Sequence, residues 1–133
     1  MTEIERNKAT TRQFFDCFVN QKYEEMSEIL DDDLVYTMPG EFPLAGVTQG
    51  KDTYINRMIR RFKGNVDDCQ MDLLNLTAEE NRVAIQAKGF FKFKDGLFYP
   101  NTYHFLYIFN DQGQIKEMIE YMDSYHFNKV FNP

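Results

Sequence analysis

The residues whose types could do chemistry gather near the end of the chain, in two apolar runs joined by a polar turn. The turn Asn110-Asp111-Gln112-Gly113 favours a three-residue hairpin loop that closes on a left-handed glycine. Asn110 then faces Gln114, and cross-strand partners share one face of a sheet. This register predicts three pairs on one face: Asn101 with Asp123, Tyr103 with Tyr121, and Phe105 with Ile119.

Asp123 is the candidate proton donor and acceptor on this face, with Tyr121 beside it in the catalytic site. A carboxylate in an aromatic pocket is desolvated, and desolvation raises its pKa towards the range useful for proton transfer. We expect Asn101 and Tyr103 to hold the polar end of a ligand above an apolar floor of Phe105 and Ile119. The alternative is that Asp123 is a strand-end carboxylate in water or a cap on the turn that follows.

The opposite face of the same strands carries a second candidate pair. The predicted register places His104 opposite Glu120. A histidine–carboxylate pair could be catalytic, although the interpretation we favour is a structural pair at a subunit interface. His126 is expected to be exposed.

A second hairpin, closed by Asp95-Gly96, precedes the first one. A two-residue loop would place Lys88 opposite Tyr103 and Gln86 opposite Phe105, so that Lys88 or Gln86 lines the pocket. A bulge at Gly89 would replace them with Ala87 and Ile85, and both registers stay open at this point.

Elements that would position these residues can be read along the chain. Apolar residues recur at three-to-four spacing in three segments, and Thr2 with Glu5 forms a capping-box pattern at the start of the first. We expect helices at residues 1–20, 23–30 and 51–62, an extended segment at 34–38, and a Pro- and Gly-marked loop at 39–50. Tyr36 and Phe18 would line the apolar end of the pocket.

The second half of the chain is predicted to be a meander of strands at residues 68–77, 82–93, 98–109 and 114–125. Helices followed by a meander indicate an α+β fold, with the helices packed on one face of a curled antiparallel sheet. Residues 103–109 are apolar on both faces, whereas a sheet with one wet face alternates. We therefore expect a homodimer in which a partner subunit covers the convex face.

Composition narrows the classes of partner. The 133 residues include 13 Phe and 8 Tyr, and the net charge is −6, which disfavours nucleic acid because phosphate binding needs a basic face. Arg57, Arg60, Arg61 and Lys63 are interpreted as a solvated helix face. Cys17 and Cys69 have no metal or redox spacing, and no apolar run is long enough for a membrane span. A cytoplasmic protein in one domain, residues 1–133, is expected.

Three segments together resemble the SnoaL-like branch of the nuclear transport factor two-like superfamily, which also contains ketosteroid isomerases, polyketide cyclase relatives and limonene epoxide hydrolases. They are YEEMSEILDDDLVYTMPG, LAGVTQGKDTYINRM and YPNTYHFLYIFNDQGQIKEMIEYMD. The resemblance implies a cone-shaped, often dimeric α+β fold with an apolar pocket and no required metal or organic cofactor. It also implies that the aspartate at position 123 acts as a general acid/base.

The leading functional hypothesis is therefore an enzyme of the isomerase, cyclase or hydrolase kind that acts on a small apolar molecule. The resemblance does not extend to the arginine–aspartate pair of the epoxide hydrolases or to the base of the ketosteroid isomerases, for which no matching residues are found. The alternative hypothesis is a non-catalytic ligand-binding or assembly module with the same fold.

Overall fold

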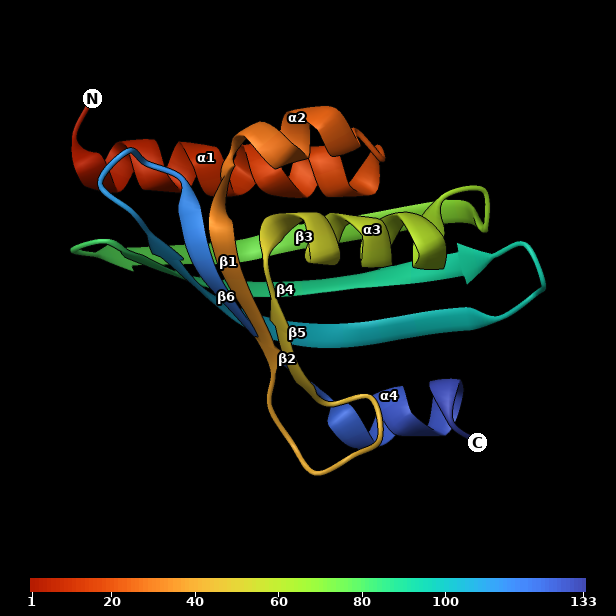
Figure 1. The fold of residues 1–133 in the computed structure, drawn as a ribbon. Coiled ribbons are helices and arrows are strands. Elements are labelled where there is room, and N and C mark those ends of the chain that lie inside the picture. Colours follow the sequence, from red (N-terminus) through yellow and green to blue (C-terminus); the bar gives the residue numbers. More distant parts are fainter.

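The computed structural model describes residues 1–133 and places helices from the N-terminal half against the concave face of a curled six-stranded sheet (Figure 1). The elements in chain order are α1 (Glu3–Val19), α2 (Tyr23–Glu28), β1 (Leu30–Met38), β2 (Gly46–Gln49), α3 (Lys51–Phe62), β3 (Val66–Glu79), β4 (Arg82–Phe93), β5 (Phe98–Phe109), β6 (Ile115–Met122) and α4 (Ser124–Phe131).

Helix α1 begins where the capping pattern predicts. The backbone N–H of Glu5 donates to the Thr2 hydroxyl oxygen at 3.1 Å, which satisfies one of the free donors of the first turn. The buried face of α1 carries Phe14, Phe15 and Cys17. The Phe14 and Phe15 rings lie 5.5 and 5.7 Å from the ring of Tyr107 on β5, so α1 is held to the concave face by aromatic contacts.

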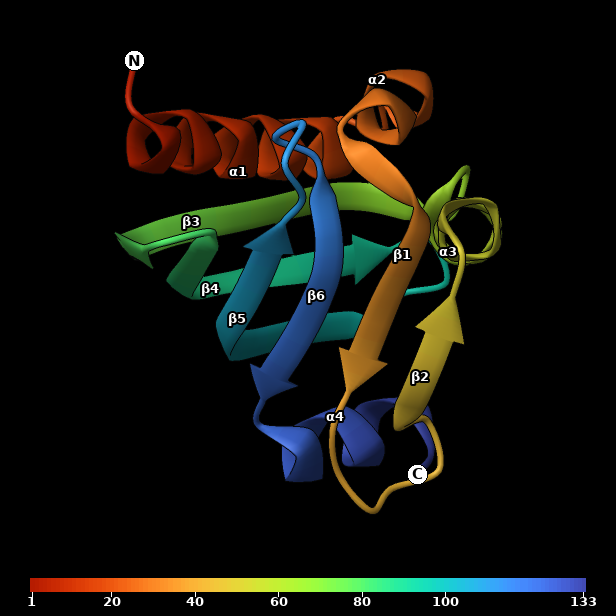
Figure 2. The ribbon, with the colours of Figure 1, turned by 60° about the vertical axis from the view of Figure 1, so that its left-hand side comes forward.

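The strand order in the sheet is β2-β1-β6-β5-β4-β3. All neighbours are antiparallel except β1 and β6, which are parallel. The short strand β2 lies inside the segment predicted to be a loop, where it pairs with β1 through Val35↔Gln49 to Met38↔Gly46. Figure 2 shows β1 and β6 side by side in front of the longer strands.

The loop between β5 and β6 has the predicted geometry, but the predicted register beyond it is wrong. Asn110 and Gln114 flank a three-residue loop, with the Asn110 N–H donating to the Gln114 carbonyl at 2.8 Å. Phe109 pairs with Ile115, yet Ile108 pairs with Glu117. Lys116 is therefore the extra residue of a β-bulge, and because side chains alternate along a strand, every later residue of β6 faces the opposite way to the prediction.

The loop between β4 and β5 is one residue longer than predicted. The Phe93 N–H donates to the Leu97 carbonyl at 2.9 Å, so Lys94, Asp95 and Gly96 form the loop. Tyr103 consequently pairs with Ala87, and Phe105 with Ile85. Lys88 and Gln86 are exposed on the other face. Ala87 and Ile85 therefore replace Lys88 and Gln86 as in the alternative register, but the predicted bulge at Gly89 is wrong, because the shift comes from the length of the loop.

Helix α4 is absent from the prediction, which assigns residues 114–125 to one strand. The strand ends at Met122, and α4 lies across the end of the sheet opposite to α1 and α2 (Figures 1 and 2). Its Phe127 is buried, with its ring 5.7 Å from Tyr99 and 5.5 Å from Phe42. This helix closes one end of the concave face. No helix in the structure combines the length and apolar character that a membrane span requires.

Candidate functional site

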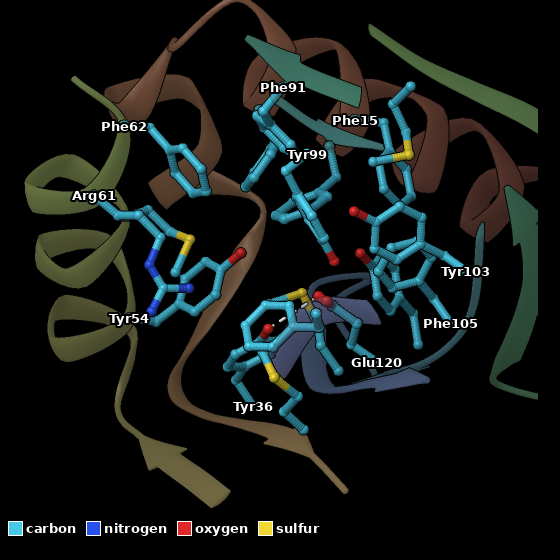
Figure 3. A pocket seen from close by; sticks show the side chains of 18 of the residues that line it. Phe15, Tyr36, Tyr54, Arg61, Phe62, Phe91, Tyr99, Tyr103, Phe105 and Glu120 are labelled. Carbon is cyan, nitrogen blue, oxygen red and sulfur yellow. Dashed lines mark hydrogen bonds between the residues drawn. The ribbon is translucent and has the colours of Figure 1, made fainter. Parts of the chain in front are cut away.

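The concave face of the sheet and the helices over it enclose an apolar pocket with a volume of about 60 Å³. Of its 19 lining residues, 17 are hydrophobic, and the other two are Arg61 and Glu120. Figure 3 shows the aromatic rings of the lining converging on the space beside Glu120.

Phenylalanine and tyrosine rings form most of the wall. Phe105 lies between Phe15 and Tyr103, with ring centroids 5.1 and 5.2 Å away. On the other side Phe62 and Phe91 stack at 5.0 Å with an interplanar angle of 20°. Aromatic pairs at these distances are favourable beyond the area that they bury, so the wall is firmly packed.

Glu120 is the only carboxylate in this lining. It projects from β6 opposite Phe105, and its Oε1 accepts a hydrogen bond of 2.9 Å from the Tyr36 hydroxyl (Figure 3). Burial raises the pKa of Glu120 to about 7, although the Tyr36 hydrogen bond and the positive charge of Arg61 oppose the rise. The group therefore takes up and releases a proton near neutral pH.

The phenols around Glu120 stay protonated across the same pH range. Burial raises the pKa of Tyr99 to about 12, and it raises the pKa of Tyr36, Tyr54 and Tyr103 well above their ordinary value. A neutral phenol is a hydrogen-bond donor as well as an acceptor. The pocket thus combines one proton-exchanging carboxylate with several fixed donors.

The interpretation of the basic run Arg57, Arg60, Arg61 and Lys63 as a solvated helix face is wrong for Arg61. It lies in the last turn of α3, is only partly exposed, and lines the pocket. Burial lowers its pKa from the usual arginine range, because a desolvated guanidinium is less stable as a cation. Its neighbour Arg60 is exposed, which agrees with the interpretation for that residue.

Four of the predicted ligand-binding residues do lie in the pocket lining: Phe18, Tyr36, Tyr103 and Phe105. Asn101 is buried, but its amide is engaged at the end of the sheet. Its Nδ2 donates to the Tyr99 hydroxyl oxygen at 2.7 Å and to the Asp123 carbonyl at 3.2 Å, and its Oδ1 accepts from the Asp123 N–H at 3.1 Å. Asn101 therefore joins β5 to the start of α4.

The predicted positions of Tyr121, Ile119 and Asp123 in the pocket are wrong. The bulge at Lys116 turns Tyr121, which is 51% exposed, and Ile119 to the convex face. Asp123 is exposed and caps α4, its Oδ1 accepting from the His126 N–H at 3.0 Å. This is the alternative that the sequence left open.

The predicted pairing of His104 with Glu120 is also wrong, since His104 pairs with Tyr121. The predicted pairing would place Glu120 on the convex face, so the predicted site does not include Glu120. One signal in the sequence could have placed Glu120 in the pocket. The apolar residues Ile115 and Met118 are three apart in the sequence, which departs from strict alternation and is typical of a bulged strand.

Comparisons with known proteins agree with this architecture. A family model described as a SnoaL-like domain matches residues 11–118. Bal32a, from a soil-derived mobile gene cassette, is 19% identical with a TM-score of 0.85, over 98% of this chain and 100% of that one. An LEH-like epoxide hydrolase from M. tuberculosis is 19% identical with a TM-score of 0.79, over 97% and 91%.

A third similar structure, TerC co-crystallised with polyporic acid, is 14% identical with a TM-score of 0.78, over 96% of this chain and 99% of that one. At these identities the likeness concerns the fold. A search of curated proteins found no match to the chain.

Proposed function

The chain belongs to the SnoaL-like domain family and has the nuclear transport factor two-like fold, and from this premise we propose that it is an enzyme that uses Glu120 as a general acid/base on a small apolar molecule. Relatives of the same fold include an epoxide hydrolase and proteins described as isomerases. The reaction would be of that isomerase, cyclase or hydrolase kind, with a carboxylate of this chain's own pocket as the acid/base.

The observation that carries the proposal is a titratable carboxylate inside an aromatic pocket. A general acid/base works best when its pKa lies near the operating pH, because it is then present in both protonation states. The pKa of Glu120 is about 7. No other carboxylate lines the pocket.

The surrounding residues give Glu120 a defined geometry. The Tyr36 hydroxyl donates to one carboxylate oxygen and leaves the other free to take a proton from a carbon next to a carbonyl, or from a water molecule. Tyr54 and Tyr103 line the same space, and their neutral hydroxyls would donate to the oxygen that gains negative charge. The aromatic wall would hold the apolar part of the substrate and exclude bulk water.

Exchange of protons next to a carbonyl for deuterium tests this proposal with ketones small enough to enter the pocket, without the natural substrate. A panel of small cyclic ketones is incubated with the protein in deuterated buffer, and NMR follows the loss of the protons next to the carbonyl. We expect catalysed exchange with the wild-type protein. The Glu120→Gln variant should lose about 100- to 10,000-fold in rate, which is the usual contribution of a general base.

Asp123→Asn is the matched control, because it makes the same chemical change at the exposed carboxylate three positions along the chain and should leave the exchange rate within about threefold of wild type. Exchange that survives Glu120→Gln, or that is lost only in Asp123→Asn, contradicts the proposal. Ketones that bind without any exchange favour the alternative of a non-catalytic binding module.

We also propose that the convex face of the sheet joins two copies of the chain. Tyr121 on this face is large, hydrophobic and 51% exposed. Ile119, two residues before it on β6, and Leu106, opposite Ile119 on β5, are partly exposed on the same face. Apolar side chains that adjoin on one exposed sheet face are typical of a protein interface. Light scattering should give a dimeric mass, and Tyr121→Glu should shift it to a monomeric mass. A monomeric wild-type protein contradicts this proposal.

A further inference from the structure

Arg61 is a pocket residue whose charge has no ionic partner in the protein. The guanidinium lies beside Tyr54, on the α3 side of the cavity, while Glu120 lies on the β6 side (Figure 3). The two ion pairs with contacts within 4 Å in the structure are Lys22–Asp16 and Lys51–Asp32. Arg61 belongs to neither, and its side chain makes no hydrogen bond to another residue.

An arginine in such a place is energetically unfavourable by itself. A partly buried charge is tolerated when it is paired or hydrogen-bonded, and an unpaired one is destabilising. A second arginine on the same helix adds to this cost. Arg57 is one turn earlier on α3, donates to the Thr48 hydroxyl oxygen at 2.7 Å, and repels Arg61 by like charge.

Glu120 compensates this charge only weakly. It lies beyond ion-pair distance of Arg61 and is already bonded to Tyr36. The remaining charged or titratable groups that line the pocket are phenols, which are neutral in this pH range. The α3 side of the cavity therefore carries a positive charge that has no ionic partner in the protein.

The position of Arg61 near the end of α3 does not explain its burial. A cation in the last turn of a helix is favoured by the helix dipole, and Arg60 supplies such a cation from an exposed position. A second arginine would serve the dipole equally well in solvent. The Arg61 side chain instead lines the cavity, and its position there calls for another cause.

We propose that the ligand of this pocket is a small apolar carboxylate, whose anionic group pairs with Arg61 while its apolar body lies among the aromatic rings. A guanidinium matches a carboxylate in planar, bidentate geometry, and such charge-assisted pairs are among the stronger hydrogen bonds in proteins. This inference rests on the proposed function, because it names the substrate class of the same site. It also orients the ligand, with the anionic end towards α3 and the body towards Glu120 on β6.

A pair of probes with nearly the same shape and different charge tests the inference by binding alone. 4-Fluorobenzoate and 4-fluorobenzamide have nearly the same shape, and titrations followed by ¹⁹F NMR measure the affinity of each. At a pH of about 6 the benzoate is ionised and Glu120 is mostly protonated. We expect the wild-type protein to bind the benzoate at least about tenfold more tightly than the amide.

Two arginine variants separate the local pair from the general charge of the helix. Arg61→Gln should abolish the preference for the benzoate, while the affinity for the amide stays within about twofold and reports an intact pocket. Arg60→Gln removes the same charge from the exposed neighbour and should keep the preference. Equal binding of the two probes to the wild-type protein, binding of neither, or a preference that survives Arg61→Gln overturns the inference.

The result of the probe titration is independent of the catalytic proposal. Deuterium exchange reports on Glu120, and the probe titration reports on Arg61. A protein that loses exchange in Glu120→Gln but shows no preference for the benzoate would retain the enzymatic function and lose this substrate class. The reverse pattern would identify an anion-binding pocket without proton-transfer activity.

Discussion

Glu120 and Asp123 are carboxylates three residues apart, and they occupy opposite environments. Glu120 lies inside the aromatic pocket with its oxygen bonded to Tyr36, and burial raises its pKa to about 7. Asp123 lies in solvent, where it accepts a backbone N–H at the start of α4. The difference shows that position on the sheet, more than residue type, decides which carboxylate can exchange a proton with a buried ligand.

The largest effect on stability and activity is expected from a pair of single-residue deletions, one at the bulge and one in the strand after it. Deletion of Lys116 removes the extra residue and leaves the pairing of Glu117 with Ile108 unchanged, so Glu120 should stay in the pocket. Deletion of Ile119 forces either Glu120 out of the pocket or Glu117 into the core. We expect the second deletion to reduce the free energy of unfolding by about 4 kcal/mol or more.

Urea unfolding followed by circular dichroism measures both deletions, and deuterium exchange measures the activity that remains. The deletion of Lys116 should cost markedly less stability than the deletion of Ile119 and should retain exchange. If the deletion of Lys116 abolishes exchange in a folded protein, the assignment of Lys116 as the bulged residue is wrong.

The next effect is a pH-dependent gain of stability in Glu120→Gln. In the unfolded chain Glu120 loses its proton near 4.5, whereas in the folded protein it keeps the proton up to about 7. Between these pH values the folded state binds more protons, so the free energy of unfolding of the wild type falls as the pH rises. Glutamine does not titrate, and the variant should gain at most about 3 kcal/mol relative to wild type across this window.

Chemical denaturation at pH values of about 4 and 8 gives this difference directly. The gain should be present in full at the higher pH and absent at the lower one. Asp123→Asn provides the contrast, with no comparable gain at either pH. A stability difference between wild type and Glu120→Gln that is the same at both pH values argues against a buried, titrating Glu120.

A smaller effect is expected at the capping residue. Asp123→Ala removes the acceptor for the His126 N–H and should cost about 1 kcal/mol, while Asp123→Asn should be nearly neutral because asparagine caps helices about as well. Thermal unfolding of the two variants measures the effect. Equal destabilisation by both substitutions would indicate a role for the negative charge that the hydrogen bond does not explain.

A change in stability of similar size is expected from Tyr36→Phe, which removes one hydrogen bond worth about 1 kcal/mol. Its informative readout is the titration of Glu120. Because the Tyr36 hydroxyl lowers the pKa of this carboxyl, the variant should titrate above 7. Carbon-13 NMR of the glutamate carboxyl carbons follows the titration, with Tyr121→Phe on the exposed face as the control. A lower pKa in Tyr36→Phe contradicts the proposed pair.

Most of the fold could be predicted because its signals are local and strong. The helical spacing in residues 51–62 and the strands at 82–93 and 98–109 have the predicted bounds. The α+β arrangement and the family resemblance are confirmed. Phe18 and Tyr36 reach the pocket as expected, since each lies on the apolar face of its element.

The acid of the pocket could not be predicted in the same way. The predicted turn at Asn110 is correct, but a register carried outward from a turn inverts all faces at the first unrecognised bulge. The position of Arg61 in the pocket could not be predicted for a different reason. In a basic run at helical spacing, the sequence does not show which arginine faces solvent, because that depends on where the sheet lies relative to the helix.

The extra residue at Lys116 also affects how this chain should be aligned with its relatives. A homologue without the insertion would carry its inward-facing acid one position nearer the hairpin tip. An ungapped alignment would then match that acid to Ile119 and leave Glu120 beside an outward-facing residue. Functional positions should therefore be transferred along this strand by backbone pairing partners, with Phe105 as the reference opposite Glu120.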